Sequence, residues 1–225
     1  MGSDFKQVWR NNGLSIVLFT LFALFLTGQS VTGWLEENSE RRDHGQQPIA
    51  LSAYLQSGSF VEATMENWES EFLQMAAYVL FTVFLYQRGS SESKSPDEEE
   101  AVDQDPRLES DKRQAPWPVR RGGWVLRIYE HSLGIAFALL FLMSFSLHAV
   151  GGAHAYNEER SLHGAPPIGT LEYLVSSQFW FESFQNWQSE FLAIWSMVVL
   201  SIFLRQRGSP ESKRVAAPHS ETGSE

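Results

Sequence analysis

Residues 14–31 read LSIVLFTLFALFLTGQSV, and this apolar stretch contains no charged residue. The hydrocarbon core of a bilayer is about 30 Å thick, which a helix of roughly 20 apolar residues can cross. A second stretch of the same kind, Ser132–Gly152, is interrupted only by small residues and His148. Both stretches therefore predict transmembrane helices.

Two further apolar blocks, Phe72–Tyr86 and Phe191–Leu204, are shorter. Blocks of about 14 residues are also compatible with buried core helices. Each block, however, continues upstream through Asn-Trp-x-Ser-Glu-Phe, which adds a helical turn and a Trp suited to the membrane interface. Residues 68–87 and 187–206 then each reach about 30 Å at 1.5 Å per residue. We therefore expect an all-α integral membrane fold with four transmembrane helices.

The first apolar block also has features of a secretory signal peptide, because Lys6 and Arg10 precede it. Ser30-Val31-Thr32, the nearest small-residue sequence after the block, is a poor cleavage site. An equivalent helix is predicted in the middle of the chain, where a signal peptide cannot be. We therefore keep the first block as a span.

The chain repeats itself at an offset of 119 residues without gaps, and residues 36–94 share 27 of 59 aligned positions with residues 155–213. Each copy contains two spans, so both copies enter the membrane from the same side. The duplication predicts two parallel two-helix repeats, related by a pseudo-twofold axis along the membrane normal. The clearest matches are Asn67–Leu73 with Asn186–Leu192 and Gln87–Lys94 with Gln206–Lys213.

Basic residues near the ends of the spans predict the orientation, because Lys and Arg accumulate on the cytoplasmic side. With the N-terminus inside, the inner segments hold 14 of the 17 basic residues, and the outer loops hold only Arg41, Arg42 and Arg160. Both termini and the central linker are therefore expected in the cytoplasm.

The composition between and after the copies differs from that of the spans. Residues 95–123 contain the acidic run Asp97-Glu98-Glu99-Glu100, four Pro and few apolar residues, which is typical of disorder. Its end, Trp117–Arg121, is either a topology signal alone or a segment that lies on anionic headgroups. The predicted order is a cytoplasmic N-terminus (1–13), repeat 1 (14–94, spans 14–33 and 68–87, outer loop 34–67), the linker (95–123), repeat 2 (124–213, spans 132–152 and 187–206, outer loop 153–186) and a disordered tail (214–225).

In each outer loop the sequence favours a long helix that begins before the second span of the copy. The N-cap is expected at Ser57 or Ser59 in the first copy, and at Ser176 or Ser177 in the second.

The overall averages conceal this segregation. A net charge of −10 and a mean hydropathy of −0.22 are typical of an acidic soluble protein, because acidic residues crowd the linker while apolar residues cluster in blocks. The absence of Cys excludes disulfides and thiolate metal sites. No phosphate-binding, dinucleotide-binding or hydrolase motif is present, so we expect no enzyme, no cofactor and no nucleic-acid partner. The lipid bilayer, other membrane proteins or further copies of the chain are the expected partners.

Four polar residues are candidates for a site within the spans. Glu71 and Glu190 occupy matched positions at the start of the second spans, and carboxylates within spans are costly and often functional. The alignment also sets Gln29 opposite His148. All four lie about 25 Å up their helices from the cytoplasmic edge. We hypothesise a polar layer in which Glu71 bonds Gln29 and Glu190 bonds His148; the alternative is that all four face headgroup water.

His44 and His163 occupy matched places in the outer loops, near Glu40 and Glu159. A His with a carboxylate can bind zinc, but the two His lie in separate copies without the close spacing of known zinc sites. They remain candidates for a weak metal site.

The paired Asn-Trp-x-Ser-Glu-Phe and Gln-Arg-Gly-Ser-x-Glu-Ser-Lys motifs resemble a bacterial family of membrane proteins recorded only as a domain of unknown function. Tyr156–Glu159 and His163-Gly164 share this resemblance, whereas the first copy departs from it with Glu37-Asn38-Ser39-Glu40. The resemblance covers nearly the whole chain. It implies a bacterial cytoplasmic membrane and supplies no activity.

The sequence therefore predicts a four-span protein that is a structural or interaction component of the membrane. The first alternative is a small transporter or channel that uses the level of Glu71 and Glu190. The second is a sensor that binds a metal ion in its outer loops.

Overall fold

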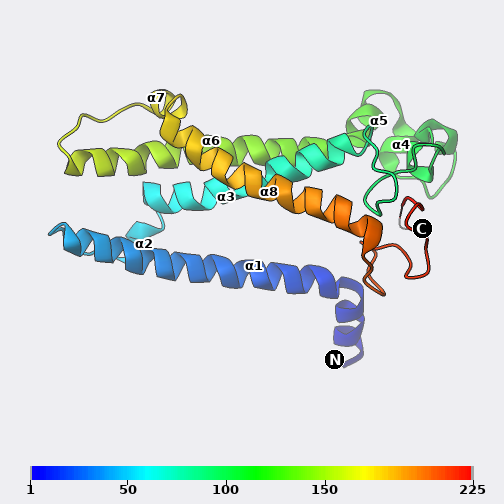
Figure 1. Ribbon diagram of the computed structural model, residues 1–225, viewed down its shortest axis with the longest axis horizontal. Coiled ribbons are helices and arrows are strands. Elements are labelled where there is room, and N and C mark those ends of the chain that lie inside the picture. Colours follow the sequence, from blue (N-terminus) through cyan, green and yellow to red (C-terminus); the bar gives the residue numbers. More distant parts are fainter. Residues whose placement is uncertain (1, 224–225) are drawn as a thin grey trace. The chain divides into compact units, whose positions relative to one another are not determined.

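The computed structural model describes the backbone of residues 2–223 and the side chains of residues 6–223. All regular secondary structure in this part of the chain is helical (Figure 1). Residues 1 and 224–225, the ends of the two predicted cytoplasmic termini, lie outside the described residues. The helices are α1 (Gly2–Asp43), α2 (Leu51–Tyr54), α3 (Gly58–Phe81), α4 (Trp117–Arg121), α5 (Gly123–Glu130), α6 (Ser132–Leu162), α7 (Thr170–Leu174) and α8 (Ser177–Phe203), with short 3-10 helices η1 (Ala101–Asp103) and η2 (Pro106–Glu109).

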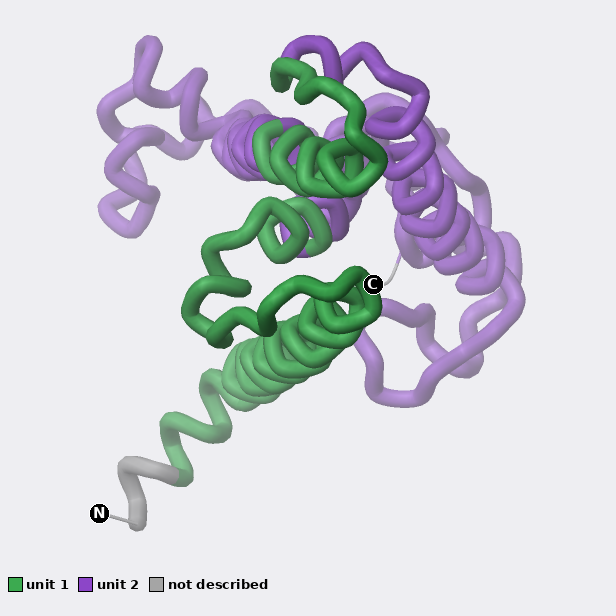
Figure 2. The backbone as a smooth tube through the Cα atoms, turned by 90° about the vertical axis from the view of Figure 1, so that its left-hand side faces the viewer, with its two compact units in different colours: residues 1–63, 150–170 green, residues 64–149, 171–225 purple. Residues whose placement is uncertain are grey.

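The chain divides into two compact units, each made of two segments (Figure 2). Unit 1 comprises residues 1–63 and 150–170, and unit 2 comprises residues 64–149 and 171–225. The units do not coincide with the sequence repeats, because α3 and α6 contribute residues to both.

Among the described residues, two helices, α1 and α6, are long and apolar enough to cross a membrane. They correspond to the first span of each copy. The expected second spans, 68–87 and 187–206, are helical only as far as Phe81 and Phe203. At the end of α8 the Arg205 guanidinium donates to the carbonyls of Ser201 and Ile202, and these are among the carbonyls that a helix end leaves without a partner. Arg205 thus helps to end α8 three residues before the predicted boundary.

The prediction that a long helix starts in each outer loop is confirmed. In the first copy the Ser57 hydroxyl accepts a hydrogen bond from the N–H of Phe60. In the second copy the Ser176 hydroxyl accepts from the N–H of Phe179, and α8 begins at the next residue, Ser177. Both contacts satisfy a backbone donor of the first turn, which is why Ser favours this position.

Local contacts recur 119 residues apart. The Asn38 side chain donates to the carbonyl of Ile49 and accepts from its N–H. Asn157 and Ile168 make the same pair of bonds in the second copy. The Gln-Arg-Gly-Ser-x-Glu-Ser-Lys motif also repeats its turn, because Ser93 accepts from the N–H of Gln87 as Ser212 accepts from that of Gln206. The duplicated sequence therefore builds the same loop and turn twice.

Unit 1 contains two close approaches that require glycine. A Cβ on Gly33 would lie 2.1 Å from the Tyr54 hydroxyl, so the ring packs directly on α1. A Cβ on Gly151 would lie 2.8 Å from the backbone N of Glu62, so α6 and the start of α3 approach backbone to backbone. Small residues commonly allow such contacts between membrane helices.

In unit 2, α3 lies beside α8, because the Gln74 amide donates to the backbone carbonyl of Glu190 at 2.9 Å. Residues 95–123 contain η1, η2 and α4. After α8, the ammonium of Lys213 donates to the backbone carbonyls of Gly89 and Glu221. The composition of the linker and the tail still predicts disorder.

Candidate functional site

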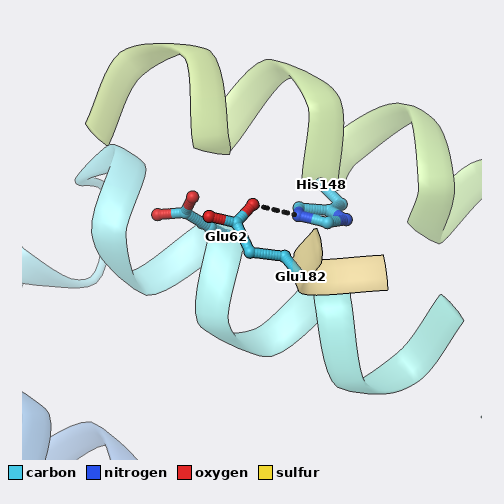
Figure 3. Close-up of side chains that lie close together, drawn as sticks. All are labelled: Glu62, His148 and Glu182. Atoms are coloured by element: carbon cyan, nitrogen blue, oxygen red, sulfur yellow. Dashed lines mark hydrogen bonds and ion pairs between the residues drawn. The ribbon is translucent and has the colours of Figure 1, made fainter. Parts of the chain in front are cut away.

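His148 lies on α6, and both nitrogens of its ring are hydrogen-bonded to carboxylates. Its Nδ1 is 3.1 Å from Oε2 of Glu69 on α3, and its Nε2 is 3.4 Å from Oε2 of Glu182 on α8. The side chains of His148 and Glu69 have no exposed surface, whereas that of Glu182 is 16% exposed. Figure 3 shows the contact with Glu182; Glu62, which it also labels, belongs to unit 1. We call Glu69, His148 and Glu182, all in unit 2, the acid–histidine cluster.

The Glu69 carboxylate accepts three hydrogen bonds. Besides His148, the hydroxyl of Ser183 lies 2.9 Å from its Oε1, and the indole N–H of Trp187 lies 3.2 Å from the same oxygen. Ser183 and Trp187 lie one turn apart on α8, so this face of α8 closes over the Glu69 carboxylate. A buried carboxylate is stable only when it is paired and hydrogen-bonded, and Glu69 meets both conditions.

The Glu182 carboxylate also accepts three hydrogen bonds. The Tyr173 hydroxyl donates to Oε2 at 2.5 Å and the Gln178 amide donates to Oε1 at 2.5 Å, while His148 provides the third donor. Burial alone would raise the pKa of Glu182, but the hydrogen bonds from His148, Tyr173 and Gln178 outweigh it and hold the pKa below its ordinary value. Glu182 is therefore an ionised carboxylate.

The hydrogen-bond partners assign the charge of His148. A neutral imidazole can donate from one nitrogen only, whereas both nitrogens of His148 face oxygens of carboxylates that also accept hydrogen bonds from other donors. The Trp187 N–H beside Glu69 can act only as a donor, which favours the ionised form of that carboxylate. His148 is accordingly an imidazolium between two carboxylates, and the cluster carries a net charge of −1.

Aromatic rings cover the cluster. The Phe179 ring stacks on the imidazole with centroids 4.6 Å apart and an interplanar angle of 28°. Phe179 itself has no exposed surface and meets the rings of Phe145 and Tyr173 edge-on. These rings exclude water from one face of His148, which strengthens its electrostatic attraction to the two carboxylates.

A third carboxylate, Glu66, lies on α3 about one turn before Glu69. The Asn186 amide donates to Glu66 Oε1 at 2.5 Å. Burial raises the pKa of Glu66, the charges of Glu182 and Glu69 raise it further, and the charge of His148 opposes them. Glu66 therefore takes up a proton more readily than an ordinary exposed glutamate does.

The structure corrects one predicted pairing of the polar layer. Both ring nitrogens of His148 face Glu69 and Glu182, so neither is left for Glu190. Glu182 lies eight residues before Glu190 on α8, which is about 12 Å along the helix, so counting residues from the cytoplasmic edge gave Glu190 the wrong height. Gln29 belongs to unit 1 and Glu71 to unit 2, and their pairing stays a prediction.

The predicted metal candidates lie apart from this cluster in the sequence. The His44 ring contacts the carbonyl of Glu40 in its own helix at 2.9 Å, and both His44 and His163 are exposed. Within residues 6–223, neither belongs to a group of three or more side chains placed to ligate one ion. Metal binding at these two residues stays a prediction.

Glu69 and Glu182 were not identified from the sequence, although the repeat contains a signal for them. The positions 119 residues from Glu69, His148 and Glu182 hold Gln188, Gln29 and Ala63. All three members of the cluster are thus places where one copy carries an ionisable residue and the other an uncharged one. A search for charge differences between the copies would have included them.

Comparison with known proteins places the chain in one family. No curated protein and no solved structure shows significant similarity to it. The sequence of residues 5–224 matches a family described as a domain of unknown function, DUF6766, and the match includes every residue of the acid–histidine cluster. The expected resemblance to a family of unknown function is thereby confirmed, and the chain belongs to the DUF6766 family.

Proposed function

We propose that the protein is a multi-pass component of the bacterial cytoplasmic membrane, with four spans arranged as two parallel repeats. Its termini and its linker lie in the cytoplasm, and its role is structural or an interaction with other membrane proteins or further copies of itself. The proposal involves no enzymatic reaction and no nucleic acid.

Large apolar side chains exposed around the long helices carry this proposal. On α1, Leu14, Phe19 and Phe25 are between 68% and 76% exposed. On α8, Leu192 and Trp195 are 56% and 61% exposed. Soluble monomers rarely expose contiguous apolar surface on this scale, whereas lipid tails cover it without cost.

The charge distribution supports the orientation. Lys6 and Arg10 lie at the start of α1, and Arg205 and Arg207 follow α8. The outer loops carry few basic residues, as the positive-inside rule requires for translocated segments. The turns repeated at Gln87 and Gln206 support a common side for the two second spans.

Single-cysteine labelling tests the topology, because the native chain has no Cys. An impermeant thiol reagent added outside spheroplasts should label Ser52→Cys and Thr170→Cys. It should not label Ser110→Cys or Ser220→Cys until the membrane is permeabilised. Outside labelling of Ser110→Cys would contradict the parallel arrangement.

A second function, transport of protons or small cations, is favoured by one specific observation. The acid–histidine cluster places ionised groups with no exposed surface on a helix predicted to span the membrane, where such groups often mark ion pathways. Flux into proteoliposomes tests this function. Glu69→Gln should abolish the flux, while Glu172→Gln, which removes an exposed carboxylate on α7, should leave it unchanged. Absence of flux in the wild-type protein would refute transport, and the structural role would be the only proposed function that remains.

A further inference from the structure

The acid–histidine cluster has a composition that a purely structural polar contact does not need. A neutral His148 would need one donor and one acceptor, yet two carboxylates from two helices converge on its ring. Replacing buried ion pairs by apolar residues is often neutral or stabilising, so the cluster is a poor device for stability alone. Its arrangement instead selects one chemical state, the doubly protonated ring.

We propose that Glu69, His148 and Glu182 form a binding site for a single proton, which the His148 ring holds between the two carboxylates. The proposal deepens the second proposed function, and it depends on that function only for what the bound proton does. Nitrogen NMR measures proton binding and proteoliposome flux measures transport, so the failure of one can be distinguished from the failure of the other.

The contacts favour a proton over a metal ion. A metal ligand must offer a lone pair, and an imidazolium has none on either ring nitrogen. Both oxygens of Glu69 and both oxygens of Glu182 also accept protein hydrogen bonds. Within residues 6–223, no buried side-chain nitrogen or oxygen lacks a partner, so an ion would have to displace existing bonds.

The exposures of the two carboxylates indicate the exchange route. Glu182 is partly exposed, whereas Glu69 is not, so the proton exchanges with solvent on the Glu182 side. On release, the Nε2–H bond of His148 breaks, the proton passes to Oε2 of Glu182, and Glu182 then loses it to water. The electron pair of the broken bond stays on Nε2. His148 is left neutral, with its Nδ1–H still donated to Glu69.

Glu69 fixes which proton leaves. Ser183 and Trp187 both donate to Glu69 Oε1, so the carboxylate stays ionised and retains the Nδ1–H of His148 on its other oxygen. Uptake and release therefore occur at Nε2. The site predicts the Nδ1–H tautomer for the neutral ring.

The other titratable groups of unit 2 near the ring are few. From α3, Glu66 and Glu69 face His148; from α8, Glu182 does; and from α7, the Tyr173 hydroxyl reaches the ring through Glu182. The three carboxylates all attract the imidazolium. Neutralising Glu66 or Glu182 should therefore make release of the proton from His148 easier. Neutralising Glu69 should do the same, and the neutral ring would then no longer be restricted to the Nδ1–H tautomer.

The repeat supplies an uncharged copy of the site. Gln188, Gln29 and Ala63 stand at the positions matched to Glu69, His148 and Glu182, whereas the matched aromatic positions hold Trp68, Tyr54 and Phe60. Three aromatic residues are thus kept in both copies, although Leu26 stands opposite Phe145, and the ionisable residues occur in one copy. The protein accordingly has one proton site and not two.

Nitrogen NMR of the full chain in lipid nanodiscs, with ¹⁵N-labelled His, tests the binding. His148 is assigned as the signal that His148→Gln removes. At pH 7 both of its nitrogens should show the shifts of a charged ring, and at higher pH the ring should become neutral as the Nδ1–H tautomer.

Variants separate the site from general effects on folding. Glu69→Gln and Glu182→Ala introduce the residues of the other copy, and each should lower the midpoint of His148 titration by at least one pH unit. Glu71→Gln and Glu172→Ala change the same charge at exposed positions and should not shift it. The wild-type titration needs no variant, so misfolding of a variant leaves the test intact.

Two results would overturn the proposal. One is a neutral His148 ring at pH 7 in the wild-type protein. The other is a stoichiometric divalent metal in the purified protein that His148→Gln removes, because this would make the cluster a metal site. A charged ring at pH 7 that becomes the Nδ1–H tautomer at higher pH would support the binding site. If proton flux is absent as well, only the transport function is refuted.

Discussion

The Nδ1 atom of His148 lies 3.1 Å from Oε2 of Glu69, and neither side chain has exposed surface. The two residues come from different sequence copies, with Glu69 on α3 and His148 on α6. The bond therefore holds the second helix of the first repeat to the first helix of the second.

Glu69→Gln should strongly destabilise the protein. It leaves the imidazolium of His148 with one carboxylate, and breaking a buried ion pair costs on the order of 3–5 kcal/mol. Thermal unfolding in one detergent measures the effect, with exposed Glu71→Gln as the control that should change little. The double variant Glu69→Gln with His148→Gln should lose less than the sum of the two single losses. If the two single losses of stability add up to the loss of the double variant, the Glu69–His148 contact has no coupling free energy.

Glu182 of the cluster and Glu66 beside it should contribute to stability with opposite dependence on pH. The pKa of Glu182 is lowered in the folded protein, so its contribution is present above the unfolded pKa of about 4.3 and is lost as the pH falls through the folded value. The pKa of Glu66 is raised, chiefly by burial, so its contribution is fully present below the unfolded pKa and is lost as the pH rises through the folded value.

At pH 7, Glu182→Gln should therefore lower the unfolding temperature, and Glu66→Gln should raise it. The position matched to Glu66 holds Gln185, so the repeat already accommodates the amide. Both differences should shrink near pH 4. Unfolding curves at several pH values in the same detergent measure them, and shifts of the same sign at pH 7 would contradict the assignment.

The sequence was sufficient for features that depend on local pattern. Apolar length identified α1 and α6, and the Ser preference at helix starts identified the caps at Ser57 and Ser176. These features depend on neighbours within a few residues. The ends of α3 and α8 were misplaced because apolar content continues beyond Phe81 and Phe203, while the backbone leaves the helix.

The partners of His148 depend on tertiary geometry that spacing alone does not contain. Counting residues gives the height of a side chain along its helix, but it does not tell which neighbouring helix its face meets. The count from the cytoplasmic edge placed Glu190 level with His148, yet Glu182, about two turns earlier on α8, reaches the ring, so the height was also misjudged. Glu69 was overlooked beside Glu71 because both precede the same apolar block, and only the buried one contacts His148.

The linker should be the main site of proteolysis. Its composition cannot bury enough apolar surface to offset the entropy of ordering the chain. Trypsin added to inside-out vesicles should cut between Ser90 and Arg121 and leave two membrane-embedded halves. Arg41 and Arg160, in the outer loops, should remain intact as internal controls. Protection of residues 95–123 would mean that the linker folds or docks.

The tail after α8 should depend on Lys213. The Lys213 residue is 2% exposed, and its ammonium donates to the backbone carbonyls of Gly89, Glu221 and His219. Lys213→Gln leaves these carbonyls without a charged donor, so carboxypeptidase should shorten the tail faster. Lys94→Gln is the control from the other copy, because Lys94 pairs with Asp103 instead. Equal, rapid trimming of the wild-type tail would support the disorder that its composition predicts.

The last prediction concerns two glycines on the same helix. A Cβ on Gly151 would lie 2.8 Å from both the backbone N of Glu62 and Val61 Cγ1, and backbone atoms cannot move aside cheaply. A Cβ on Gly134 would meet nothing within 4 Å. Gly151→Ala should therefore destabilise the protein by about 1–3 kcal/mol, as overpacking commonly does. Gly134→Ala should be neutral or stabilising by roughly 0.5–1 kcal/mol, because alanine loses less chain entropy in a helix.

Unfolding temperatures of the two variants in one detergent measure the difference between the two sites. Gly58→Ala provides an independent check from the facing helix, since its Cβ would lie 2.6 Å from the backbone N of Ala155. It should behave as Gly151→Ala does, because both substitutions force the same pair of backbones apart. If Gly151→Ala and Gly58→Ala are as stable as Gly134→Ala, α3 and α6 do not approach at these residues in the membrane. The contact within unit 1 would then be wrong, although the acid–histidine cluster of unit 2 would be unaffected.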